Sequence, residues 1–156
     1  MYYAIDIAEY IIHFCDKNGH PTNNMLLQYT LYLIQNKFLQ INGKRFFADD
    51  FEAWAMGPVI PNVYYKYCHW GAIPIQKLNK NPEFHFKPNE IIIMNEIIQI
   101  CHKARIHDLW EKIIEHDPSF TEIYKEGKGN KKTISIKQIQ NYLPLHIQII
   151  DTLAKG

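Results

Sequence analysis

Cysteine and histidine are the residues of this chain best suited to nucleophilic or metal chemistry, and four of them are neighbours. Cys68-His69 and Cys101-His102 are adjacent pairs, and a third cysteine, Cys15, stands apart from them. Adjacent residues on a helix point about 100° apart, so neither pair places a thiol against its own general base. Two cysteines separated by two to four residues, a common zinc-binding pattern, do not occur. The sequence therefore predicts no catalytic residue, no metal ligand and no cofactor. It predicts that the cysteines are buried and act as small apolar residues.

Two further arrangements involve residues that do acid–base or metal chemistry. A fold that gathered Cys68, Cys101 and nearby histidines would make a small thiol or metal enzyme, which stays open as an alternative. His107-Asp108 and His116-Asp117 have the composition of acid–base dyads. Each of these pairs stands near an expected helix end, and we expect both at the surface.

Lysines are concentrated in the loop 125–132, which begins at Lys125 and ends at Lys132. The loop holds four lysines against one glutamate, a local charge of +3. Lysines contact phosphates, so a DNA-binding regulator that uses this loop is a second alternative. The loop has no arginine and no interleaved aromatic residue, and its glycines favour a mobile, solvated segment.

The densest pattern in the chain is an acidic, aromatic segment followed by a glycine and two prolines. It predicts a short helix over about 50–55, a break at Gly57, and a second helix that begins at Pro61. Gly57 precedes a proline and can adopt a positive φ, which favours a stiff elbow between Trp54 and Tyr64. Such an elbow either packs two helices together or presents a preorganised docking surface.

Helical periodicity dominates the other elements that must position these residues. Apolar residues recur at spacings of three and four, with capping residues where helices begin or end. The run 91–101 is apolar on almost every side, which predicts a central helix buried by its neighbours. Helices are expected over 3–17, 61–71, 88–101 and 107–116. Three more are expected to begin at capping residues: one at Thr22 or Asn23 that runs to 38, one at a capping box at Ser119 that runs to 127, and one at a capping box at Ser135 that restarts at Pro144. Strands are expected at 44–47 and 133–134, and a loop is expected over 72–89 with an extended segment near 83–87. These elements predict a mainly α fold, in which residues 1–156 form a single compact helical domain with a small accessory β-sheet or hairpin.

Composition and charge exclude several classes of protein. Hydrophobic residues make up 47% of the 156 and charged residues 21%, which is typical of a folded domain and not of a disordered chain. The formal charge of +1 provides no overall field to attract nucleic acid or an anionic membrane. No apolar run approaches the about 20 residues that span a bilayer, and the first residues lack the basic stretch of a signal peptide. Three widely spaced cysteines favour reduced thiols, so we expect a cytoplasmic protein without a membrane partner.

Two segments carry a resemblance to a known family. The first is Glu52-Ala53-Trp54-x-x-Gly57-Pro58-Val59-x-Pro61-x-Val63-Tyr64, and the second is Leu27-Gln28-Tyr29-Thr30-Leu31-Tyr32. The first resembles the signature of the Panacea domain, the SocA-like antitoxin family also described as phage-associated proteins. The second is similar to that family's Leu-Gln-Lys-Leu-Leu-Tyr helix, with Tyr29 in place of the lysine. The resemblance covers about residues 4–71, and Phe120 stands near a position where many members have tryptophan.

The resemblance implies an antitoxin that binds and neutralises a cognate toxin protein. It also implies a helical fold with a small sheet, without catalysis and without a cofactor. Members of the family that deliver toxins to a cellular protease would have that protease as a second partner. Nucleic acid and membranes are not expected partners. The candidate toxin-binding residues are Glu52, Trp54, Gly57, Pro58, Val59, Pro61, Tyr64, Gln28 and Tyr32.

Overall fold

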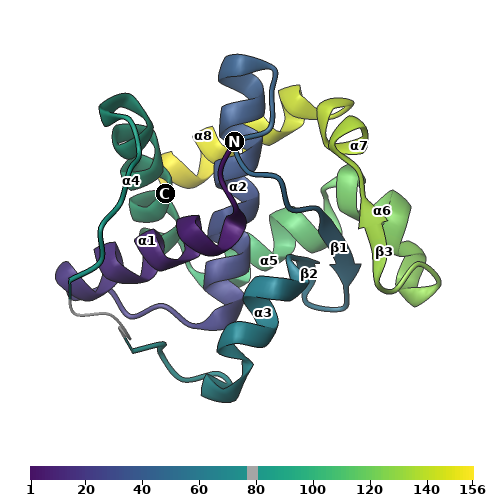
Figure 1. The fold of residues 1–156 in the computed structure, drawn as a ribbon. Coiled ribbons are helices and arrows are strands. Elements are labelled where there is room, and N and C mark those ends of the chain that lie inside the picture. Colours follow the sequence, from purple (N-terminus) through teal and green to yellow (C-terminus); the bar gives the residue numbers. More distant parts are fainter. Residues whose placement is uncertain (77–80) are drawn as a thin grey trace.

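The computed structural model describes residues 1–76 and 81–156, which form a mainly helical fold (Figure 1). Of the residues that the structure describes, 64% are helical, and a small antiparallel sheet has the strand order β2-β1-β3. The predicted mainly α fold with a small accessory sheet is therefore confirmed. The helices are α1 (Ala4–Lys17), α2 (Asn24–Asn42), α3 (Pro61–Tyr67), α4 (Pro88–Lys103), α5 (Ile106–Trp110), α6 (Pro118–Tyr124), α7 (Ile136–Gln140) and α8 (Leu143–Lys155), and the strands are β1 (Phe51–Trp54), β2 (Gly57–Val59) and β3 (Lys132–Ile134).

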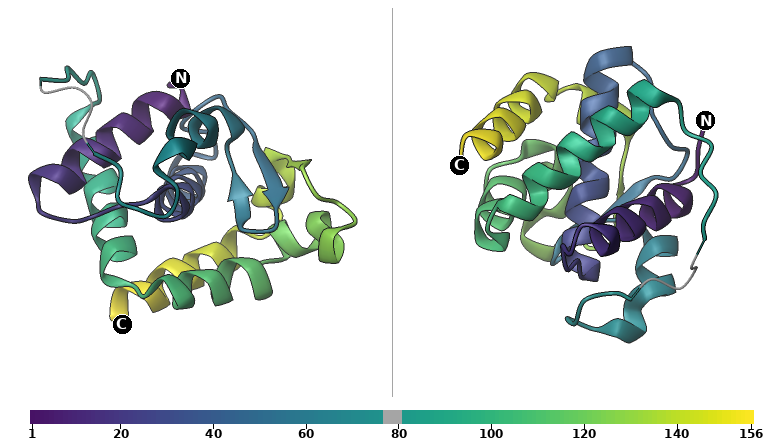
Figure 2. Two further views of the ribbon diagram at one scale, coloured as in Figure 1. Left: turned by 90° about the horizontal axis from the view of Figure 1, so that it is seen from below. Right: turned by 90° about the vertical axis from the view of Figure 1, so that its left-hand side faces the viewer.

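Helix α2 is the centre of the molecule. The views of Figure 2 show it surrounded by α1, α4, α8 and the sheet, and thirteen of its nineteen residues are buried. It begins after Asn23, whose side chain accepts the backbone N–H of Leu26 at 2.9 Å. It ends at Asn42, and the next residue, Gly43, has a φ of 67° that provides the left-handed turn that stops a helix. Of the two predicted caps, Asn23 is the one used.

The prediction of a central helix at 91–101 is wrong. Helix α4 buries one face, through residues such as Met94 and Ile98, whereas Ile92 is 68% exposed. The hydropathy pattern does not identify α2 as the central helix, because that helix carries buried amides, among them Gln28 and Gln35. These amides bond to the backbone of segments packed around the helix, so burial there is stabilised by polar contacts as well as apolar ones.

The strand predicted at 44–47 is not formed. Phe47 makes an isolated bridge with Tyr2, and the neighbouring backbone is held by Gln35. The Oε1 atom of Gln35 accepts the N–H of Phe46 at 2.7 Å, and its Nε2 atom donates to the carbonyl of Phe47 at 3.1 Å. These bonds occupy backbone groups that a second strand would need.

The predicted elbow is a β-hairpin, so the helix predicted over 50–55 is wrong. Strands β1 and β2 pair antiparallel, with Trp54 opposite Gly57. Side chains along β1 alternate between buried and half-buried, which is the two-residue period of a strand. The expected positive φ at Gly57 is present, at 115°, and the helix predicted to begin at Pro61 does so as α3.

The third strand comes from a distant part of the chain. Strand β3 pairs with the other edge of β1, with Glu52 opposite Thr133 and Phe51 opposite Ile134. It confirms the strand predicted at 133–134 and places the C-terminal half of the protein beside the hairpin (Figure 1).

The loop 125–132 is held by backbone hydrogen bonds, in contrast to the mobile segment that its composition predicts. The N–H of Lys131 donates to the carbonyl of Ala53 at 2.7 Å, and the N–H of Gly129 donates to the carbonyl of Tyr124 at 2.8 Å. The lysine side chains of the loop are exposed, as expected. The backbone that carries them is therefore fixed to the sheet.

The remaining helix ends agree with the sequence in part. Asp117, not Ser119, caps α6, because its side chain accepts the N–H of Ser119 at 2.9 Å. Ser135 caps α7 as predicted, through the N–H of Gln138 at 3.1 Å, and Pro144 lies in the first turn of α8. The predicted loop is seen at 72–76 and 81–87, with no strand near 83–87, and its residues 77–80 lie outside the described residues. In the described part of the chain, no helix is long and apolar enough to cross a membrane.

Candidate functional site

Three aromatic side chains gather on the outer side of the hairpin, Trp54 from β1 and Tyr64 and Tyr65 from α3. The centroid of the Trp54 ring lies 4.9 Å from that of Tyr64 and 5.9 Å from that of Tyr65, and the two tyrosine rings are 5.5 Å apart. Tyr65 is 57% exposed, while Trp54 and Tyr64 are half-buried. We call these three residues the aromatic cluster. Tilted and edge-on contacts restrict the orientation of each ring while leaving part of its surface open to a partner.

Glu52 lies on the same face of β1 as Trp54, because residues two apart on a strand point to the same side. The Nε1 atom of Trp54 donates a hydrogen bond to Oε2 of Glu52 at 3.0 Å. Tyr64 contacts the same indole through its ring. The structure therefore brings together three of the predicted site residues, Glu52, Trp54 and Tyr64.

Lys131 adds a cation to this surface. Its Nζ atom lies 5.3 Å from the centroid of the Trp54 ring, within the range of a cation–π interaction. Its backbone is fixed by the bond to Ala53 and by a left-handed φ of 66°. Residues 125–132, named the lysine loop from here on, thus border the aromatic cluster. This neighbour could not be predicted from the sequence, because no local pattern connects residue 131 with Trp54.

Gly57 and Tyr29 determine the shape of the hairpin turn on the side that faces the core. A Cβ added at Gly57 would lie 3.0 Å from Cε1 of Tyr29, and the φ of 115° is unfavourable for any other residue type. The hydroxyl of Tyr29 donates to the carbonyl of Met56 at 2.8 Å. Burial raises the pKa of Tyr29, so its hydroxyl remains a donor at neutral pH. The tyrosine that replaces the family's lysine at this position supports the turn from the core.

Gln28 links α2 to the start of α3. Its Oε1 atom accepts the backbone N–H of Ile60 at 2.9 Å, and its Nε2 atom donates to Oδ1 of Asn24 at 3.2 Å. Asn24 in turn donates from Nδ2 to the carbonyl of Tyr64 at 3.0 Å. Two side chains of the central helix therefore satisfy backbone groups directly beneath the aromatic cluster.

The predicted site residues divide into two groups by burial. Glu52, Trp54, Pro61 and Tyr64 are partly exposed, so a partner can reach them. The buried residues position the hairpin from inside, and in the free protein no partner can touch them. They are Gln28, Tyr32, Gly57, Pro58 and Val59.

We expect Gln28→Leu to lower the free energy of unfolding by about 1–3 kcal/mol, the usual loss when a buried donor is left without an acceptor. The N–H of Ile60 would lose its partner while the volume of the side chain is nearly conserved. Urea denaturation measures the loss. Met25→Leu, at a half-buried position of the same helix, is the control and should change stability by less than about 1 kcal/mol.

Asp117 belongs to a buried polar cluster with Tyr32, Ser119 and His146, all at most 1% exposed. The surface position predicted for His116-Asp117 is therefore wrong for Asp117. The hydroxyl of Tyr32 donates to Oδ2 of Asp117 at 2.6 Å, and Nε2 of His146 lies 3.0 Å from Oδ1 of Asp117 and 3.1 Å from Oγ of Ser119. A Ser-His-Asp triad uses opposite nitrogens of the imidazole, whereas here the aspartate and the serine approach the same one. The cluster joins α2, α6 and α8.

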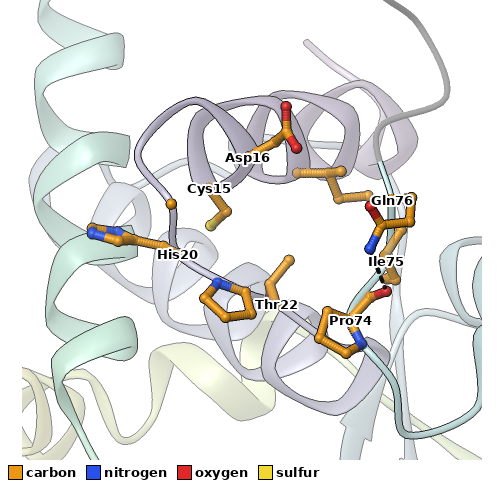
Figure 3. Close-up of a pocket in the computed structure, with 10 residues that line it drawn as sticks. Cys15, Asp16, His20, Thr22, Pro74, Ile75 and Gln76 are labelled. Atoms are coloured by element: carbon orange, nitrogen blue, oxygen red, sulfur yellow. Dashed lines mark hydrogen bonds between the residues drawn. The ribbon is translucent and has the colours of Figure 1, made fainter.

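The thiols are placed poorly for nucleophilic chemistry. Cys15 borders a pocket of about 200 Å³ beside α1, with Asp16 and Thr22 (Figure 3). His20 points away from this pocket toward α4, where its ring stacks on His102 at 3.9 Å. Burial raises the pKa of Cys15 to about 11, which keeps the thiol protonated at neutral pH.

The other two cysteines occupy different environments. Burial raises the pKa of Cys101 to about 12, whereas Cys68 is exposed and its Sγ atom lies 3.3 Å from the carbonyl of Tyr65. Among residues 1–76 and 81–156, no three His, Cys, Asp or Glu side chains form a group that could hold a metal ion. This holds although His102 and His107 are separated by four residues, a spacing also found in zinc sites.

Comparison with known proteins identifies the family. The family model described as "Antitoxin SocA-like, Panacea domain" matches residues 27–119, more than half of the chain. The matched residues include most of α2, the hairpin and α3, and end before the lysine loop. No curated protein and no solved structure gives a match. The chain belongs to the SocA-like antitoxin family of Panacea domains.

Proposed function

We propose that this protein is an antitoxin that neutralises a cognate protein toxin by binding it at the outer face of the hairpin. The observation that carries the proposal is the aromatic cluster, held in one arrangement by α2 and partly open to solvent. Tryptophan and tyrosine are enriched among the residues that contribute most to binding at protein interfaces, because they bury a large area with few rotatable bonds. Family membership supplies the class of partner, since the family is described as antitoxin-like.

The proposed action is binding without a chemical step. The two buried thiols have raised pKa values, and the imidazole of His146 is enclosed in the core. Neutralisation by masking requires contact with the toxin alone. Delivery of the toxin to a cellular protease requires a second surface in addition, and we propose masking as the minimal action.

Co-expression tests the proposal. The reading frame next to this gene is expressed from an inducible promoter, alone and together with the antitoxin. Growth arrest by the neighbouring product alone, relieved by co-expression and accompanied by co-purification of the two proteins, is the expected result. A neighbouring product that is harmless alone, or that arrests growth equally with and without this protein, contradicts the proposal for that pair.

We expect Glu52→Ala and Tyr64→Phe to leave the melting temperature nearly unchanged, while at least one of them weakens rescue. Both side chains are partly exposed, and the ring of Tyr64 that packs on Trp54 is kept in the second variant. Loss of a preorganised polar group reduces binding free energy without removing core packing. Thermal melting and growth rescue are measured on the same variants.

Tyr3→Phe and Glu96→Ala are the matched controls, because Tyr3 is 63% exposed and Glu96 is exposed on α4, outside the hairpin. Both should fold and rescue fully. If Glu52→Ala and Tyr64→Phe also rescue fully, the toxin docks on another surface. If they melt far earlier than the controls, these side chains stabilise the fold, and the family signature marks architecture.

A further inference from the structure

The lysine loop beside the aromatic cluster has a net positive charge. The lysine loop carries Lys125, Lys128, Lys131 and Lys132, all exposed, against one glutamate. Within the described residues, no salt bridge involves any of these four lysines. The whole chain has a charge of only +1, so the positive charge is a local property of this surface.

We propose that the partner meets this surface through an acidic protein segment that also carries an apolar side chain. Its carboxylates would face the lysine loop, and its apolar side chain would cover the exposed edge of Trp54 and Tyr65. The proposal rests on the proposed function and specifies the chemistry of the toxin at that site. Complementary charge speeds the encounter between two proteins and suppresses wrong partners, while a central aromatic contact supplies much of the affinity.

The geometry of the rings favours a protein segment over single-stranded nucleic acid. Bases stack on open aromatic faces, but Lys131 lies over the ring of Trp54, and Tyr64 packs on the same indole at 63°. The Tyr64 and Tyr65 rings are inclined at 79° to each other, so the cluster offers no row of parallel faces. A protein side chain can bind against the edge of one ring or between two inclined rings.

The lysine loop lies outside the part of the chain that the family model matches. The family match ends at residue 119, whereas the loop begins at 125. The hairpin that carries Trp54 lies inside the matched region, and the lysines that border it do not. The surface therefore combines a family element with a segment outside the family model.

The test uses nuclear magnetic resonance spectra of the full-length protein and a short synthetic peptide. The peptide has alternating glutamate and leucine residues, and its counterpart has lysine in place of every glutamate. The indole N–H signals of Trp54, Trp70 and Trp110 serve as three reporters in one spectrum. We expect the acidic peptide to shift the Trp54 indole and the Lys131 amide while leaving Trp70 and Trp110 in place, and the basic peptide to shift none of them.

Charge reversal provides the second measurement. Lys128→Glu combined with Lys132→Glu avoids the two lysines of the loop that have positive φ, and should weaken binding of the acidic peptide at least about tenfold at low salt. Lys155→Glu, at the far end of α8 (Figure 1), changes an exposed lysine away from the sheet and should leave binding unchanged. Raising the salt concentration should reduce the difference between the two variants, because salt screens exposed charges.

Equal shifts by both peptides, an unmoved Trp54 signal, or full binding by the charge-reversed protein overturns the proposal. Binding of a thymidine oligonucleotide to the Trp54 indole at about 150 mM salt, at lower concentration than the peptide, also overturns it and favours nucleic acid. The proposed function fails separately, through the rescue experiment. Rescue that depends on Glu52 or Tyr64 but is insensitive to charge reversal retains the antitoxin and rejects only the acidic segment.

Discussion

Gly57→Ala is expected to lower the free energy of unfolding by about 2–4 kcal/mol. Two independent contributions add at this position. The φ of 115° is strained for alanine, and the new methyl group would lie 3.0 Å from Cε1 of Tyr29 and 3.5 Å from Ile114. Relief of the close contact would move Tyr29 and break its bond to the carbonyl of Met56. For a chain of this length, such a loss lowers the melting temperature by roughly 5–15 °C.

Gly43→Ala separates these two contributions. Gly43 has a φ of 67° and no atom within 4 Å of an added Cβ, so it reports the cost of the left-handed backbone alone. That cost is about 1–2 kcal/mol. Equal losses in the two variants would show that the contact with Tyr29 contributes nothing, and a loss below about 1 kcal/mol at Gly57 would contradict the proposed support of the hairpin. Urea denaturation with an unchanged m-value establishes that stability, and not the unfolded state, is altered.

Asp117→Ala is expected to cost about 3–5 kcal/mol, because it leaves several buried donors without their acceptor, at about 1–3 kcal/mol each. Its carboxylate accepts hydrogen bonds from the hydroxyl of Tyr32 and the N–H of Ser119, and lies 3.0 Å from His146. The alanine variant leaves Tyr32 and His146 without this acceptor and removes the cap of α6. Burial is the main cause of the raised pKa of Tyr32, with the charge of Asp117 second, so that hydroxyl stays protonated and keeps its demand for an acceptor.

Asp108→Ala is the control for this experiment. Asp108 pairs with Arg105 at 3.0 Å, and the arginine side chain is 80% exposed. Exposed pairs of this kind contribute little to stability, because solvent screens them. Tyr32→Phe should fall between the two, because it removes one hydrogen bond to a charged group, worth about 1.5–3 kcal/mol. An Asp117 variant as stable as the Asp108 variant would contradict the view that this cluster holds α2, α6 and α8 together.

Most helix positions could be predicted from the sequence, because their signals are local. The apolar period of α1, the cap at Asn23 and the proline that begins α3 each act within a few residues. The hairpin could not be recognised in the same way. Strand β1 has four residues, too few to distinguish a two-residue period from a helical one, and its second partner β3 lies far along the chain.

The candidate site was predictable to a similar extent. Glu52, Trp54 and Tyr64 follow from the family signature, and Tyr65 is next to Tyr64 in the sequence. The buried roles of Gln28 and Tyr32 could not be inferred, since the same residue types serve equally well at an interface or as donors and acceptors inside a core. Lys131 needed the sheet itself, because pairing of β3 with β1 is what carries the lysine to the indole.

The order of the strands also affects how the protein matures during translation. Strand β3 follows β1 by about 80 residues, which at 5–20 residues per second corresponds to roughly 4–16 s of synthesis. Until then β1 can pair only with β2, and one of its edges is open. A nascent chain that has already made residues 52–64 therefore still lacks the lysine loop beside the aromatic cluster. The third strand can pair only after residues 132–134 have been synthesised, so a translational pause between the two strands would prolong the interval in which one edge of β1 is open.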